Sequence, residues 1–200
     1  GMIYAHNIIT DEDYPLVVQL YEDGRFEAQI PMQHPIHTAV VFERKWVPFY
    51  IEPGQTLSMV VDWDEFLEAD RKRNVRYKFN DVAFTGPSAR INDELLRWEI
   101  PYPDYLAMQQ KQKSTTPADF KRERMLIWKE ETASLEAQFA RNNLLPQTEA
   151  LLRAELMISH STYLLDFPLH RNYFAEQDST NEVLKVPVED QYYDFLQELP

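Results

Sequence analysis

The chain has 200 residues, of which 44% are hydrophobic and 13% aromatic, and its 33 acidic and 20 basic side chains give a formal net charge of −13. This apolar content is typical of a packed globular protein and excludes a disordered chain. The negative charge argues against binding to nucleic acid or to anionic membrane surfaces, because clustered Lys and Arg hold proteins to both.

The chain contains no cysteine. This absence excludes disulfides, thiol catalysis, iron–sulfur clusters and zinc sites built from Cys. No apolar run approaches the roughly 18 residues that span a bilayer, and no signal peptide is recognisable. Gly1 in front of Met2 is typical of the residue left when an expression tag is cleaved, so the missing signal peptide carries little weight.

The first half of the chain has the pattern of short antiparallel strands. Apolar and polar residues alternate along it, and Glu22-Asp23-Gly24-Arg25 and Pro53-Gly54 are turn signals between runs. The predicted strands lie at residues 16–21, 26–30, 36–42, 49–51, 57–63 and 75–79. Short strands separated by turn signals in this way predict an antiparallel β-sandwich.

The pattern becomes helical at Gly86-Pro87-Ser88. Phe84-Thr85 is predicted to be a strand that leads into a helix, for which Ser88 is a suitable N-cap. Thr116-Pro117-Ala118-Asp119 combines a capping Thr, Pro at the first helical position and an acid in the first turn. This signal predicts a long helix that reaches Asn142-Asn143.

Two more helices are predicted before the end of the chain. Pro146 opens a helix that Pro168 should end or kink, and a last helical run carries Tyr192 on its apolar stripe. Strands therefore come first and helices second, which excludes the alternating pattern of a Rossmann or TIM-barrel chain. We predict an α+β protein with an antiparallel β-sandwich at residues 1–86 and an α-helical region at residues 87–200 packed on it.

Two short clusters are candidates for metal binding. His34 and His37 are three positions apart, and in a strand such side chains point to opposite faces, so they do not share one ion. Asp62-Trp63-Asp64-Glu65 concentrates carboxylates but lacks the calcium loop of an EF-hand, and Asp64 is suited to cap a short helix. We predict no metal site at either cluster.

No motif indicates a reaction. The chain has no Gly-x-Ser-x-Gly elbow, and its four glycines do not form a phosphate-binding loop. Triads and carboxylate pairs form in space and have no fixed spacing in a sequence. We therefore predict a protein that is not an enzyme, with no catalytic residue and no cofactor, while an enzyme of unknown class is a further alternative.

Four aromatic residues are candidates for a contact surface. Trp46 and Trp63 lie near predicted strand ends, where an exposed ring would mark a sugar or protein contact. Tyr192 lies on the apolar stripe of the last helix, whereas Tyr193 lies off it and would suit a contact with a segment that follows residue 200. Packing in the core or at a domain junction is nevertheless the favoured interpretation for Trp46 and Trp63.

Several groups of residues carry a resemblance through their order along the chain. They are Pro53-Gly54 with Thr56-Leu57 and Val60-Val61-Asp62, then Phe84-x-Gly86 with Ala89 and Asn92, and finally Tyr163-Leu164-Leu165-Asp166-Phe167 and Tyr192-Tyr193-Asp194-Phe195-Leu196. This order resembles the region ahead of the thioredoxin fold in TlpA-like thiol-disulfide oxidoreductases of the bacterial envelope. The catalytic Cys-x-x-Cys of that family has no counterpart here.

The resemblance implies a non-catalytic accessory domain in the periplasm or cell envelope. Such a domain would position a thioredoxin-fold module that follows residue 200, recognise client proteins or mediate dimerisation. Two alternatives stay open, namely a binding domain for carbohydrate or another small envelope ligand, and the enzyme of unknown class. Coplanar, exposed rings of Trp46 and Trp63 beside the acidic cluster would favour the carbohydrate-binding alternative.

Overall fold

The computed structural model describes residues 1–7, 12–42, 45–71, 77–98 and 104–199. It confirms the predicted α+β class, with antiparallel sheets and long helices. The chain divides into two compact units, Gly1–Glu99 and Ile100–Pro200. The sequence pattern changes at residues 86/87, whereas helix α2 (Ala89–Leu96) belongs to the first unit.

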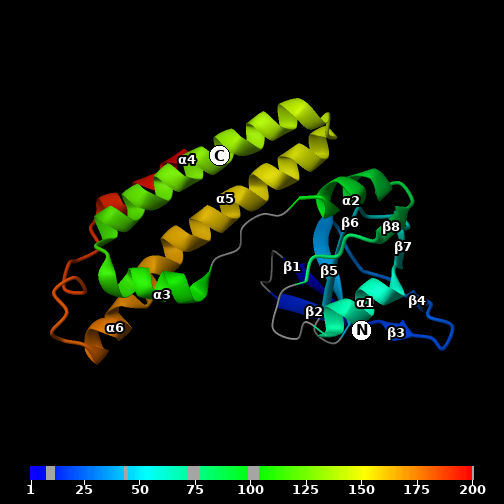
Figure 1. Cartoon of the computed structure of the whole chain (residues 1–200), viewed down its shortest axis with the longest axis horizontal. Helices are drawn as coiled ribbons and strands as arrows, with labels where there is room; N and C mark the ends of the chain where they lie inside the picture. The colour runs from blue at the N-terminus through cyan, green and yellow to red at the C-terminus, as the bar shows by residue number, and fades with distance from the viewer. Residues whose placement is uncertain (8–11, 43–44, 72–76, 99–103, 200) are drawn as a thin grey trace. The chain divides into compact units, whose positions relative to one another are not determined.

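The described strands of the first unit form small, open antiparallel sheets (Figure 1). The largest has four strands in the order β2-β1-β5-β6, and two pairs of strands, β3-β4 and β7-β8, make up the others. The bounds are Met2–Asn7 for β1, Glu12–Val17 for β2, Gln19–Leu20 for β3, Phe26–Glu27 for β4, Ile36–Phe42 for β5, Lys45–Ile51 for β6, Ser58–Val61 for β7 and Val82–Thr85 for β8.

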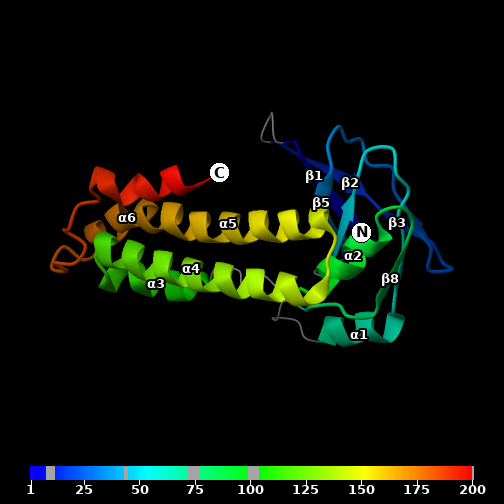
Figure 2. The same cartoon turned by 90° about the horizontal axis from the view of Figure 1, so that it is seen from above.

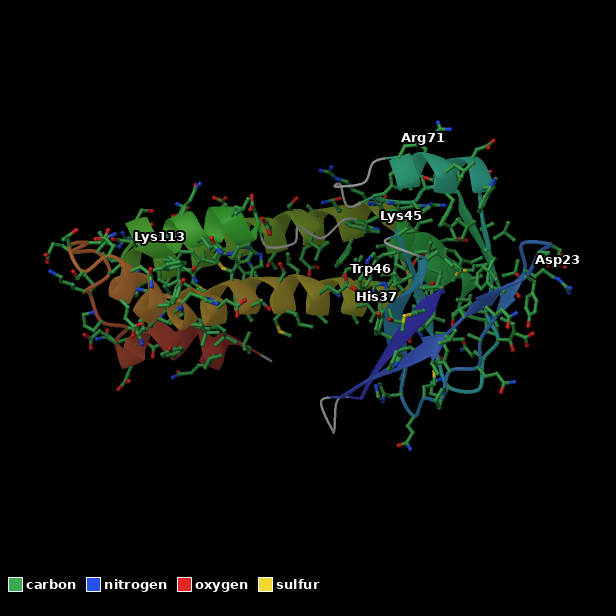
Figure 3. All side chains as sticks on the ribbon, turned by 90° about the horizontal axis from the view of Figure 1, so that it is seen from below. Asp23, His37, Lys45, Trp46, Arg71 and Lys113 are labelled. Carbon is green, nitrogen blue, oxygen red and sulfur yellow. The ribbon has the colours of Figure 1, made fainter. Side chains whose placement is uncertain are left out.

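The predicted turns are confirmed. Asp23 lies at the tip of the β3–β4 hairpin (Figure 3), where the Gly24 amide donates to the Tyr21 carbonyl at 2.9 Å. Gly54 has a φ of +78°, which a residue without a Cβ adopts at no steric cost. Turn chemistry is local, and this explains why the sequence predicts it correctly.

Several strand predictions differ from the structure. Strand β1 is missing from the prediction, and the predicted strand at 16–21 is divided between β2 and β3. The predicted strand at 57–63 ends at Val61, because helix α1 (Trp63–Arg71) begins there. Of the predicted strand at 75–79, residues 77–79 are not in a strand, and the remainder lies outside the described residues.

Asp62 and Glu65 have structural roles around α1. Asp62 Oδ1 accepts from the Glu65 amide at 2.8 Å, so Asp62 caps the helix in place of the predicted Asp64. The buried Glu65 carboxylate accepts from the amides of Asn80 and Asp81, both at 2.8 Å. The acidic cluster thus orders the segment that leads into β8.

The core of the first unit contains side chains from all three described sheets and from helices α1 and α2. The register aligns Leu16, Ile3, Val40 and Val47 across the four-stranded sheet, and these side chains face the same cluster as Phe84 of β8. Phe66 of α1 packs against this cluster. One face of the large sheet is therefore covered by β7–β8 and α1.

The second unit is helical, and its long helices α4 and α5 lie side by side (Figures 1 and 2). Its elements are α3 (Tyr105–Ser114), α4 (Pro117–Asn142), α5 (Pro146–Leu169), α6 (Arg171–Gln177) and a 3-10 helix η1 (Asp190–Glu198). Thr116 caps α4 as predicted, with its hydroxyl accepting from the Asp119 amide at 3.2 Å. Arg153 of α5 forms an ion pair with Glu136 of α4 at 2.6 Å.

Helix α5 ends at Leu169, one residue after Pro168, and α6 begins at Arg171, as expected for a proline that ends a helix. A proline has no amide hydrogen, so the carbonyl four residues earlier, at Leu164, loses its helical donor. The Tyr192 hydroxyl donates to that carbonyl at 2.8 Å. The side chain of Gln112 donates to the carbonyls of Asp166 and Phe167 at 3.0 and 3.1 Å. Side chains from α3 and η1 therefore donate hydrogen bonds to backbone carbonyls in the last turns of α5.

Candidate functional site

The outer face of the four-stranded sheet, which points away from the core, carries Trp46. Side chains alternate along a strand, so Trp46 points away from the core that its neighbour Val47 enters. The register aligns Val17, Met2, Val41 and Trp46 in one row across β2, β1, β5 and β6. Trp46 is 54% exposed and Val17 is 81% exposed, and Figure 3 labels Trp46 and His37 on this sheet.

Trp63 lies on the other side of the same sheet. It is 60% exposed and stacks on Phe66, with ring centroids 5.5 Å apart and an interplanar angle of 9°. Phe66 packs against the core that the inner face of the sheet forms. Both tryptophans are therefore exposed, which corrects the expectation of core packing and is what a contact role requires. They do not form one coplanar platform.

The two tyrosines of η1 have different environments. Tyr192 is buried in the core of the second unit, with Phe120, Leu164, Phe167 and Phe195. Burial raises the pKa of its hydroxyl, which keeps the group protonated as a donor to Leu164. Tyr193 is partly exposed and packs edge-on against Tyr192 at 5.3 Å. Of this pair, only Tyr193 offers a ring to a partner.

The residues that carry the family resemblance in the first unit have structural roles. The buried Asn92 side chain accepts from the Tyr50 amide at 2.6 Å and donates to the Tyr50 and Ser88 carbonyls, both at 2.8 Å. Gly86 has a φ of +122°, and a Cβ there would collide with the backbone oxygen of Thr56. Ser88 precedes α2, but its hydroxyl donates to Gln55 instead of capping the helix.

The outer face of α5, which lies opposite its buried face, is an apolar surface that the sequence prediction did not identify. Ile158, Leu165 and Leu169 follow spacings of seven and four residues, so they share one face, and they are 58%, 42% and 69% exposed. The buried face of α5 carries Leu156 and Leu164, which makes the helix apolar on both sides. The seven- and four-residue spacing of these apolar side chains was readable from the sequence.

A buried polar group lies between α4 and α5. His160 of α5 is fully buried, and its ring stacks on Trp128 of α4 at 5.3 Å with an interplanar angle of 8°. Its Nε2 lies 2.9 Å from Oε2 of Glu131, but the contact lacks the direction of a hydrogen bond. Arg124 of α4 lies over the Tyr163 ring at 3.9 Å. Within the described ranges, both ring nitrogens of His160 lack a hydrogen-bond partner.

The environment of His160 favours its neutral form. Burial and, to a smaller extent, the positive charge of Arg124 lower the pKa of His160 to about 4. Burial also lowers the pKa of Arg124, although the nearby Tyr163 and Glu131 oppose this change. His160 lies inside α5 rather than at its end.

The predicted histidine and acidic clusters are separate in the structure. His34 lies in a bend before β5 and His37 lies within β5. Across the residues that the structure describes, no group of three or more His, Cys, Asp or Glu side chains is placed to hold a metal ion. No helix among the described residues is long and apolar enough to cross a membrane. In comparisons with known proteins, no family model, no curated protein and no solved structure matches the chain.

Proposed function

We propose that this chain is a non-catalytic interaction domain that belongs to a larger thioredoxin-like thiol-disulfide oxidoreductase of the bacterial envelope. The outer face of α5 carries the proposal. Burying an exposed Leu or Ile side chain contributes about 1.5–3 kcal/mol, so a face with Ile158, Leu165 and Leu169 gains free energy when a partner covers it. The partner on this face would be the thioredoxin-fold module, and client proteins would be a second class of partner.

The family part of the proposal rests on the resemblance of the sequence. In support, the residues that carry the resemblance occupy packed positions. The Asn92 side chain is hydrogen-bonded to β6, Gly86 lies against Thr56, and the Tyr192 hydroxyl is hydrogen-bonded to α5. The proposal extends to a sandwich-like first unit, since side chains of β7–β8 share a core with the four-stranded sheet. A location in the periplasm or cell envelope follows from the family, and no reaction is proposed for the chain itself.

The alternative of a carbohydrate-binding domain depended on Trp46 and Trp63 forming one platform. Their positions on opposite sides of the sheet do not support it. A thermal-shift screen with sugars tests this alternative directly. A rise of the melting temperature that Trp46→Ala abolishes would favour it over the accessory domain.

The coding sequence after Pro200 is the first test of the proposal. A strand–Cys-x-x-Cys–helix pattern within about the length of one domain is expected. A stop codon, or a following domain without a cysteine pair, would contradict the oxidoreductase part of the proposal. This test requires no assumption about which surface the partner contacts.

Binding of the separately produced thioredoxin-fold module tests the surface. We expect Ile158→Ser with Leu165→Ser to weaken binding at least about tenfold in calorimetry, since each substitution removes apolar contact area. Val60→Ser is the matched control, because Val60 is 68% exposed but lies on β7 of the first unit. Equal affinities for the double variant and the control would show that the outer face of α5 is not the contact surface.

A further inference from the structure

His160 is a titratable side chain that is buried between helices α4 and α5. Its ring is fully buried between α4 and α5 and stacks on Trp128. Buried polar atoms in folded proteins nearly always have hydrogen-bond partners, because leaving one without a partner costs free energy. In the part of the chain that the structure describes, neither His160 nitrogen has one. A residue placed in this way is sensitive to any change of its charge.

Side chains of negative and positive charge face the His160 ring or its immediate neighbours. From α4, Glu131 lies 2.9 Å from Nε2, and Arg124 contributes an opposing positive charge. From α5 itself, Tyr163 lies beneath the Arg124 guanidinium. At the start of α3, the Asp104 amide donates to the Tyr163 hydroxyl at 2.8 Å. Glu131 favours a protonated ring, whereas burial and Arg124 disfavour it.

We propose that protonation of His160 weakens the packing of α4 on α5, so that the helical unit is stable near neutral pH and loosens in mildly acidic solution. The inference does not depend on the proposed function. The desolvation of a buried imidazolium is the dominant effect, because the ring is fully enclosed. Glu131 offsets it only in part, since its side chain is 34% exposed and its contact with Nε2 is poorly directed.

The direction of the pH effect follows from the two protonation states. The pKa of His160 is lowered to about 4 in the folded protein, whereas an unperturbed histidine has a pKa near 6.5. Between these values the unfolded chain binds more protons than the folded one, so the free energy of unfolding falls as the pH decreases from about 6.5 toward 4. Above about pH 6.5 the contribution of His160 is constant.

Thermal unfolding of the whole chain at pH 7.5 and 5.0 tests the proposal. His160→Phe keeps an aromatic ring against Trp128 and removes the titrating nitrogens. We expect the melting temperature of the wild-type helical unit to fall on acidification by roughly 4 °C or more beyond the fall in His160→Phe. His170→Gln is the matched control: it removes an exposed histidine of the same unit and should keep the wild-type pH response.

Substitutions of Glu131 and Arg124, the charged neighbours of His160, give a second measurement in which His160 itself is not mutated. Glu131→Gln removes the charge that favours protonation and should leave the fall between pH 7.5 and 5.0 at least as large as in wild type, because His160 is already almost neutral at pH 5.0 in the folded protein. Arg124→Met removes the opposing charge and should reduce it. Equal pH responses of wild type and His160→Phe, or a wild-type helical unit that becomes more stable in acid, would overturn the proposal. An NMR titration in which His160 protonates near pH 6.5 in the folded protein would also overturn it.

Discussion

At the scale of single residues, Asn92 bonds the backbone at the edge of a sheet. Strand β6 is the last in its sheet, and an edge strand offers free amides and carbonyls to other chains. The side chain of Asn92 bonds both backbone groups of Tyr50, as a neighbouring strand would. Pro48, two residues earlier on the same strand, has no amide hydrogen to offer. These two residues remove the pairing groups of Tyr50 and the amide donor of Pro48 from this edge.

Asn92→Asp tests this role with almost no change of shape. The carboxylate cannot donate to Tyr50 or Ser88, and it places a charge where the side chain is buried. We expect the free energy of unfolding to fall by about 3 kcal/mol, measured by urea denaturation. Asp93→Asn, at the next position of α2, should change it by less than about 0.5 kcal/mol. Similar values for the two variants would show that the bonds of Asn92 contribute little.

At the scale of elements, the end of α5 depends on η1. Pro168 removes the helical donor of the Leu164 carbonyl, and the Tyr192 hydroxyl replaces it. The segments that contain these residues also share a core, in which Phe120 stacks on Phe167 at 3.9 Å. The proline is therefore accommodated in the last turn of α5 because a distant segment supplies the missing hydrogen bond.

A double-mutant cycle measures this replacement. Tyr192→Phe leaves the buried Leu164 carbonyl without its donor and should lower the free energy of unfolding by about 2 kcal/mol. In a Pro168→Ala background the helical amide returns, so the same substitution should cost clearly less. Tyr193→Phe is the control, because the Tyr193 ring is partly exposed. Equal costs of Tyr192→Phe in both backgrounds would contradict the replacement.

At the scale of the whole molecule, each compact unit has its own hydrophobic core. The core of the first unit includes Val47 and Phe84, and that of the second includes Phe120 and Phe167. Since no residue belongs to both clusters, a core defect in one unit should act mainly on that unit. A single melting temperature would then describe the protein incompletely.

Hydrogen exchange resolves the two units in one experiment. Val47→Ala should lower the opening free energy of the amides in residues 1–98 by about 2 kcal/mol and leave those of α4 and α5 unchanged. Phe167→Leu should have the opposite pattern, with its effect confined to the helical unit. The two substitutions act as controls for each other, and a uniform effect of either across the chain would show that the units unfold together.

The sequence predicted the features that depend on neighbouring residues. Thr116 and Pro117 begin α4 through a cap and a fixed φ, and Gly24 and Gly54 form turns because they adopt positive φ. The order of strands before helices, and hence the α+β class, follows from local periodicity alone. The exposed Trp46 and Trp63 were identified as candidates, but the sequence did not place them on opposite sides of a sheet.

Only the tertiary structure decided which distant groups meet. Strand β1 pairs with β2 and β5, and the bonds of Asn92 to Tyr50 and of Tyr192 to Leu164 join residues 42 and 28 positions apart. The burial of His160 against Trp128 and Glu131 likewise depends on how α4 packs on α5. Such contacts leave no fixed spacing in a sequence, because their geometry is set by the packing of whole elements rather than by the backbone preferences of adjacent residues.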